Sequence, residues 1–306
     1  MAAVLAALAT ACAMGAWRLT LARWPWRAPR AAILLWQSLG VTWGLASVGA
    51  LLSYALQPYG GGVLYGLRAF AESAVSFGMG YGLLSPYDLP RAGALAAGLT
   101  LLAVLVVVLL LAGAQTLRAR RRHRVLLSLI AHDDPGIPGV RVVDHPKAAA
   151  YCLPGLRSEV VVSAGTLSLL DRDELTAVLA HEAAHVRERH DLVLLPFTAL
   201  KWALPWLSVV RDAHSSVALL VEMAADDHAR RYCSPRRLAT ALLRFGTAGT
   251  VPAPHGALGM AGEHVMARVN RLIKPGAVLP RRCRYGLVTF SALLFVSAPL
   301  LWIYPG

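Results

Sequence analysis

The chain has 306 residues, of which 57% are hydrophobic and only 15% are charged, and its mean hydropathy is +0.53. Soluble domains are about a quarter charged and less than half apolar, so this composition excludes an ordinary soluble domain and indicates a membrane protein. The formal net charge is +13, but the basic residues gather at the ends of apolar runs. This placement favours a positive-inside membrane bias over direct nucleic-acid binding.

The first apolar segment runs from Met1 to the first charge at Arg18. A secretory signal peptide would carry its positive charges before the apolar stretch, whereas here Arg18, Arg23, Arg27 and Arg30 all follow it. We therefore expect a retained membrane span with the N-terminus outside the cell.

Three further uncharged segments are long enough to cross a bilayer. They run from Ala31 to Leu56, from Ala92 to Leu117 and from Tyr285 to Gly306. The third span is followed by a cluster of five arginines between Arg118 and Arg124, which should stay cytoplasmic. The sequence therefore predicts four transmembrane helices, with the Leu56–Arg91 loop outside and residues 118–284 in the cytoplasm.

The cytoplasmic part begins with strand signals and then turns helical. Val140–Val143 and Glu159–Ser163 are rich in β-branched residues and predict two short strands. Asp171, followed three residues later by Glu174, is typical of a capping box at the start of a helix. Apolar residues at helical spacing then predict a helix from Arg172 to His190.

The predicted helix carries the pattern His181-Glu182-Ala183-Ala184-His185. Histidines four apart lie on one helical face, and a pair of neutral imidazoles at that spacing suits zinc. Glu182 is placed to act as the general base, because zinc lowers the pKa of bound water to about 7 and a neighbouring carboxylate can accept the proton. We expect one Zn²⁺ per chain.

A second helix-like segment holds Glu222 and Asp226. A catalytic zinc site has three protein ligands, and Glu222 fits as the third, while Asp226, one turn later, is suited to bind a ligand histidine from behind. The alternative is that both acids form a solvated face, and spacing alone does not exclude Asp227 as a ligand.

These motifs resemble those of the gluzincin membrane peptidases. The resemblance includes Ala149–Gly155, Val160–Gly165 and Glu174–His185, and Glu222 with Asp226 matches the E-x-x-x-D motif of these families. With three spans before the zinc motif and one after it, the chain looks most like the BlaR/MecR-type antirepressor peptidases, with the HtpX and CAAX-protease type as the close relative.

The resemblance, which covers residues 118–284, implies a cytoplasmic α+β zincin domain inserted between the third and fourth spans. It also implies that the segment matching Ala149–Leu153 is an edge strand that pairs with extended substrate. BlaR-type sensors carry a penicillin-binding domain with a Ser-x-x-Lys motif, but no lysine of this chain has a serine three residues before it. Direct β-lactam sensing by this chain is therefore not expected.

The apolar stretch Leu192–Val210 is interrupted by Pro196, Lys201 and Pro205. A single crossing here would put His181 and Glu222 on opposite sides of the membrane, so they could not share a metal. We therefore expect a re-entrant or interfacial hairpin, or a buried pair of short helices.

The remaining candidate polar residues lie outside the predicted metal site. His190 is interpreted as a helix-end residue rather than a metal ligand. Arg268 and Arg271 have acidic side chains as possible partners, but lipid headgroups are expected instead. Four histidines are candidates for stabilising an oxyanion without a matching motif: His214, His228, His255 and His264.

The sequence thus predicts three spans in 1–117, a cytoplasmic zinc peptidase domain in 118–284 with an apolar hairpin at 192–210, and a fourth span in 285–306 of a bacterial inner-membrane protein. Resemblance to the BlaR/MecR type implies a transcriptional repressor of the BlaI type as substrate. The alternatives are an HtpX-like quality-control protease and a catalytically idle signalling scaffold.

Overall fold

Among the residues that the computed structural model describes, four helices are long and apolar enough to cross a membrane, judged by length and composition alone. They are α1 (Ala2–Leu21), α2 (Pro29–Ala55), α4 (Leu89–Ile130) and α11 (Arg281–Ile303). They coincide with the four predicted spans, although their crossing of a bilayer stays a prediction. The structure describes residues 1–60, 62–77, 89–133, 140–153, 159–247, 261–274 and 276–304.

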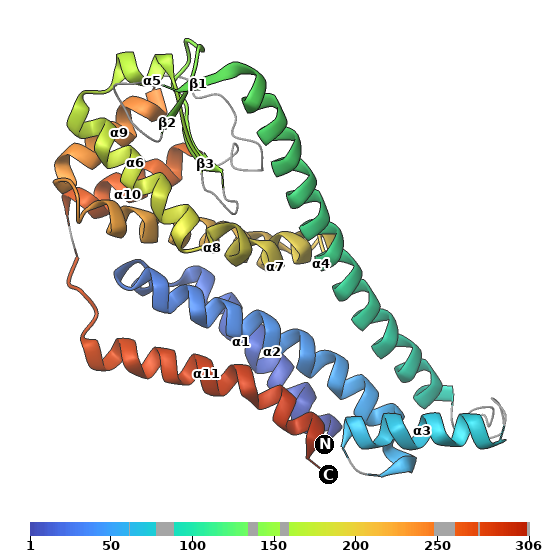
Figure 1. Ribbon diagram of the computed structural model, residues 1–306. Coiled ribbons are helices and arrows are strands. Elements are labelled where there is room, and N and C mark those ends of the chain that lie inside the picture. The colour runs from blue at the N-terminus through green and yellow to red at the C-terminus, as the bar shows by residue number, and fades with distance from the viewer. Residues whose placement is uncertain are drawn as a thin grey trace.

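Helices α1, α2 and α11 lie side by side, with α2 in contact with both of the others (Figure 1). Trp36 of α2 is 1% exposed in the core that joins α2 to α1. By contrast, α4 presents apolar side chains such as Leu110, which is 66% exposed. An outward apolar surface of this kind is what contact with lipid requires.

Helix α4 is much longer than the predicted third span. It continues through the basic cluster that ends at Arg124 and stops only at Ile130, where the first strand begins. Its 42 residues correspond to about 63 Å at about 1.5 Å per residue. Figure 1 shows α4 running from beside α3 (Val63–Phe77) up to the sheet. The helix therefore links the apolar helices to the sheet without a break.

The sheet has four strands in the order β1-β2-β4-β3. The predicted strands β2 (Val140–Val143) and β4 (Glu159–Ser163) are confirmed, and they pair in parallel. β1 (Ala131–Asp133) and β3 (Ala150–Leu153) add antiparallel partners on the two sides. β3 therefore lies at an edge of the described sheet, as the resemblance implies.

Gly165 is the second residue of α5 (Ala164–Leu169), which follows β4 directly. A Cβ atom at this position would lie 2.1 Å from the carbonyl oxygen of Pro146. Only glycine allows that approach, so this residue of the sequence motif packs α5 against the segment that leads into β3.

Helix α6 (Arg172–Arg187) begins with the predicted capping box, in which Asp171 and Glu174 each bind the other's backbone N–H. The predicted end at His190 is wrong. Arg189 takes a left-handed backbone conformation with φ of 49°, which ends the helical path, and His190 becomes the first residue of the next helix.

The apolar stretch after α6 forms two helices, α7 (His190–Ala203) and α8 (Ser208–Ala229). Pro205 lies in the turn between them, and Pro196 lies inside α7. The two helices pack on each other and share a core with α1 and α2, to which Phe197 and Leu220 contribute. Leu192–Val210 thus contains most of α7 and only the start of α8, and a hairpin confined to this stretch stays a prediction. The two helices bring α8 beside α6.

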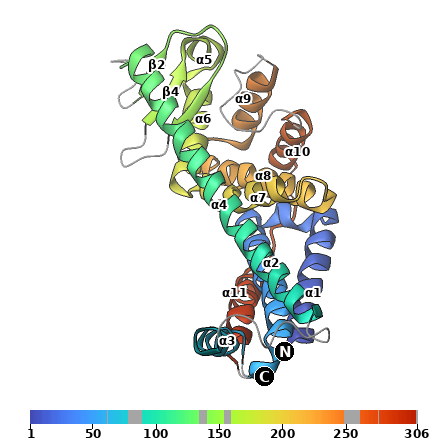
Figure 2. The ribbon, with the colours of Figure 1, turned by 90° about the vertical axis from the view of Figure 1, so that its right-hand side faces the viewer.

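Two short helices complete the upper part of the molecule, α9 (Pro235–Thr247) and α10 (Ala261–Ile273). Figure 2 shows the sheet and α5 on one side and α9 with α10 on the other, above α7 and α8. Their shared core includes Leu238 and Leu272 together with Ala177 of α6. The packing fixes α10 next to the contact between α6 and α8, where the candidate site lies.

Candidate metal centre

His181 and His185 project from α6 toward Glu222 on α8. One ligand atom from each of the three residues lies within 4.8 Å of the other two. Among the residues that the structure describes, these three form the one group of histidine, cysteine or acidic side chains that is placed to hold a metal. The three predicted ligands are thus brought together from segments about forty residues apart.

The separations between these atoms fit a tetrahedral zinc ion. Nε2 of His181 lies 3.2 Å from Nε2 of His185 and 3.3 Å from a carboxylate oxygen of Glu222, whose other oxygen lies 3.5 Å from Nε2 of His185. Neighbouring donors on a tetrahedral zinc with bonds of about 2.0–2.1 Å are about 3.3–3.4 Å apart. The donor set and its spacing therefore suit zinc.

Asp226 lies behind the histidine pair, with 1% of its side chain exposed. One of its oxygens is 3.1 Å from Nδ1 of His181, off the line of a well-aligned hydrogen bond. This is the position predicted for a residue that orients a ligand histidine through its second ring nitrogen.

Arg268 of α10 is the residue at this site that the sequence analysis did not predict. Its side chain is 8% exposed, and it lies 2.9 Å from a carboxylate oxygen of Glu222 and 3.3 Å from Nε2 of His181. It also binds Asp226 through two nitrogens. The expected lipid headgroup partner is wrong for Arg268, because the guanidinium is buried against carboxylates.

Arg271 also has a protein partner, since it lies 2.8 Å from Asp227 and donates to the backbone oxygen of Trp26. Lipid headgroups are therefore not its main partners either. The same contact turns Asp227 toward α10, and Asp227 is not part of the described metal-binding group.

The other histidines do not join the cluster. His214 contacts Thr198, His264 contacts Ser215, and His228 packs against the ring of Tyr232. His255 lies outside the described residues. None of the three described histidines belongs to the metal-binding group.

The surroundings of the site shift the pKa values of the two proposed ligand histidines in opposite directions. Burial lowers the pKa of His181, but Asp226 and Glu222 raise it by more, to about 9 in the metal-free protein. Burial lowers the pKa of His185 to about 3. Burial also raises the pKa of Asp226, but Arg268 more than reverses this effect and brings it to about 2. Asp226 is therefore charged at neutral pH, and His185 is neutral.

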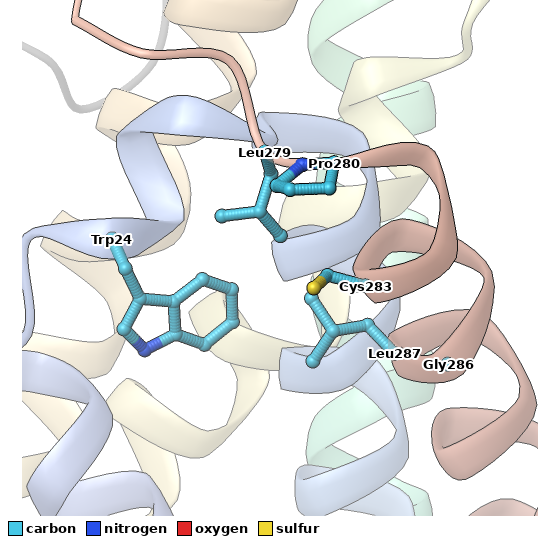
Figure 3. A pocket seen from close by; sticks show the side chains of 6 residues that line it. All are labelled: Trp24, Leu279, Pro280, Cys283, Gly286 and Leu287. Atoms are coloured by element: carbon cyan, nitrogen blue, oxygen red, sulfur yellow. The ribbon is translucent and has the colours of Figure 1, made fainter.

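A cavity of about 430 Å³ lies elsewhere, between Trp24 and the start of α11. Figure 3 shows the indole of Trp24 facing Leu279 and Leu287 across this space. Its lining is almost entirely apolar and contains none of the proposed ligands. This cavity is therefore separate from the candidate metal centre.

Comparisons with known proteins indicate the class to which part of the chain is similar. Residues 116–225 match the family described as Peptidase family M48. A protease HtpX homolog of Salinibacter ruber is 32% identical over 111 residues, or 34% of this chain and 40% of the relative. A protease HtpX homolog of Aeropyrum pernix is 41% identical over 61 residues, or 20% of this chain and 19% of the relative.

These matches support a membrane-type zinc metallopeptidase. The chain spans less than half the length of these two relatives. No solved structure matches the chain significantly.

Proposed function

We propose that the protein is a membrane-embedded zinc endopeptidase with His181, His185 and Glu222 as its metal ligands. The observation that carries the proposal is the convergence of these side chains at separations that suit zinc. A zinc ion held by these residues would lower the pKa of a bound water to about 7 and would so provide a nucleophile for amide hydrolysis at neutral pH.

The surrounding residues have distinct proposed roles. Glu182 follows the first ligand on α6 and accepts the proton of the attacking water, then donates it to the leaving amine. Asp226 orients His181 through Nδ1, and Arg268 balances the charge of Asp226. Glu222 keeps 33% of its side chain exposed among the described residues.

Strand β3 is the proposed substrate platform. Its register pairs Tyr151 with Val161 of β4, so one side of β3 is occupied by the sheet, while the described residues place no strand on its other side. β3 also contacts α6, which carries the two histidines. An extended peptide added to this edge would therefore run beside the candidate ligands.

The proposed substrate is a protein at the cytoplasmic face, in particular a transcriptional repressor of the BlaI type. This proposal is supported by the sequence resemblance to BlaR/MecR-type peptidases and by the order of the spans around the zinc motif. The protein would then be a multi-pass protein of the bacterial inner membrane, with the lipid bilayer as its surroundings and no direct nucleic-acid contact.

The second candidate is an HtpX-like protease that degrades damaged membrane proteins. The match to Peptidase family M48 and the two HtpX homologs support it. Neither candidate requires a different site, because both hydrolyse peptide bonds with the same ligands. They differ in the substrate that reaches β3.

Two experiments test the proposal. Metal analysis with a casein or repressor cleavage assay separates a peptidase from an idle signalling scaffold, which would cut neither substrate. Whole-cell proteomes with and without the gene then separate the two substrates. Stabilisation of one repressor supports signalling, whereas accumulation of many membrane proteins without a repressor supports quality control.

A further inference from the structure

His190 contacts the ring nitrogen of the proposed ligand His185 that does not face the metal cluster. Its side chain is 4% exposed, and its Nδ1 lies 3.0 Å from Nδ1 of His185. The left-handed conformation of Arg189 makes this contact possible, because it turns the chain so that the first residue of α7 faces back onto α6. Nε2 of His185 faces the other two proposed ligands, and His190 contacts its other ring nitrogen, Nδ1.

If His185 binds a metal, the donor and the acceptor of this hydrogen bond are fixed. A neutral imidazole has one N–H, so a ring that ligates through Nε2 carries its hydrogen on Nδ1. Nδ1 of His190 must then accept that hydrogen bond, and the hydrogen of His190 must lie on Nε2. That Nε2 is 3.5 Å from a carboxylate oxygen of Glu188, longer than a normal hydrogen bond but close enough for electrostatic attraction.

Glu188 is held in turn by Arg30, in the first turn of the candidate span α2. Nε of Arg30 donates to Oε2 of Glu188 at 2.9 Å, and Nη2 donates to Oε1. Nη2 also donates to the backbone oxygen of Ala224 on α8, at 3.1 Å. Burial raises the pKa of Glu188, but the pairing with Arg30 lowers it by more, so Glu188 is a carboxylate at neutral pH.

The geometry argues against His190 as a fourth metal ligand. Its ring lies on the side of His185 opposite to His181 and Glu222, and it is absent from the metal-binding group of the described residues. Ligand histidines commonly donate their second N–H to an acceptor that fixes the tautomer and the ring orientation. His190 is in position to be that acceptor.

We propose that His190, Glu188 and Arg30 are positioning residues for His185, and that they tie this ligand to the membrane helix α2. The inference rests on the proposed function, because it requires a metal at His185. It predicts that a residue in a membrane helix, far from the metal in sequence, helps to set the metal affinity.

The test uses the full-length protein in nanodiscs, with zinc affinity measured by competition against a chelator. Removing a hydrogen-bonding partner of a ligand weakens metal binding about 10–100-fold, so we expect this loss in His190→Ala and a smaller loss in Arg30→Met, which acts on His190 only through Glu188. His190→Asn should retain most of the affinity, because its amide oxygen can replace Nδ1 as the acceptor. The visible spectrum of the cobalt-loaded protein should shift in the two weakened variants and not in His190→Asn.

Arg120→Met is the matched control. Arg120 comes from another candidate span, α4, and pairs with Asp191, which is adjacent to His190 but not in the cluster. The variant removes a similar ion pair between a membrane helix and α7, and it should leave both zinc affinity and the cobalt spectrum unchanged. If Arg30→Met does not fold, the pair His190→Ala and His190→Asn still tests the proposal outside the membrane helices.

Wild-type affinity and an unchanged spectrum in both His190→Ala and Arg30→Met would overturn this inference alone. So would an equal loss in Arg120→Met, which would indicate a general packing effect. Failure of the wild-type protein to bind zinc would instead overturn the proposed function, and the positioning role with it.

Discussion

Arg268 donates two hydrogen bonds to Asp226, from Nη2 to Oδ1 at 2.7 Å and from Nε to Oδ2 at 2.9 Å. Both side chains are almost completely buried. Because a buried carboxylate is costly without a counter-charge, the arginine allows Asp226 to stay ionised behind His181. The geometry of the proposed metal site therefore depends on α10, which supplies none of the ligands.

Replacing Arg268 by methionine should destabilise the metal-free protein. The change leaves Asp226 buried without its partner, which typically costs about 3–5 kcal/mol. Thermal unfolding in detergent should show a clear loss of stability. Arg237→Met is the control, because Arg237 pairs with Asp173 at an exposed position and such pairs contribute about 1 kcal/mol or less. Equal effects of the two substitutions would argue against a structural role for the buried pair.

Local patterns were sufficient to predict the parts of the site that depend on neighbouring residues. The spacing of His181 and His185 defines one helical face, and the capping box at Asp171 fixes where that face begins. The position of Glu222 also followed from its motif. The histidine spacing and the capping box are each set within a few turns of one helix, so they can be predicted without knowledge of the packing, whereas Glu222 was selected through its resemblance to a family motif.

The contacts of Arg268 and His190 depend instead on how distant segments meet. Arg268 reaches Asp226 only because α9 and α10 pack beside α6, through residues such as Leu238 and Leu272. His190 reaches His185 because one residue, Arg189, adopts a left-handed conformation that helical periodicity does not reveal. The extension of α4 to Ile130 was missed because the basic cluster Arg118–Arg124 interrupts the apolar pattern and resembles a cytoplasmic linker.

The orientation of the protein can be tested with single cysteines in a variant that lacks the four native ones. A cysteine at Arg120 or Arg189 should resist an impermeant thiol reagent in intact cells, because the basic clusters are predicted to be inside. A cysteine at Tyr65 in α3, which is 62% exposed, should react. Labelling at Arg189 from outside would place the histidines on the wrong side for a cytoplasmic substrate.

Variants that lack a proposed ligand should hold less zinc than variants that lack a neighbouring residue. His181→Ala, His185→Ala and Glu222→Ala should each lower zinc occupancy sharply, since each removes one of three donors. Asp226→Ala should weaken zinc binding about 10–100-fold, as loss of an orienting partner does. Metal analysis after dialysis measures both effects. Full zinc occupancy in Glu222→Ala would mean that the third ligand is wrongly assigned.

Zinc affinity should rise with pH. His181, whose pKa is about 9 without metal, must lose a proton before it can bind, whereas His185, with a pKa of about 3, is already neutral. Because one proton is displaced per ion, apparent affinity should increase about tenfold per pH unit between about pH 6 and pH 8 and level off above about pH 9. Chelator competition across this range measures the slope, and a slope near zero or near two would contradict the assignment.

The final prediction concerns Glu182, which is half-buried on α6 beside His181. Glu182→Gln preserves the size of the side chain but replaces a proton-accepting carboxylate with an amide that cannot accept a proton. Zinc should remain bound, because the three proposed ligands are unchanged.

Proton transfer by a positioned group contributes about 10²–10⁴-fold, so turnover of Glu182→Gln should fall by at least that factor. Substrate should still associate with the edge of β3, and the variant should co-purify with uncut substrate. Glu222→Ala is the informative comparison, because it should lose metal and activity together, whereas Glu182→Gln should lose activity alone. Near-normal cleavage by metal-loaded Glu182→Gln would show that another residue accepts the proton, and the proposed division of roles on α6 would have to be abandoned.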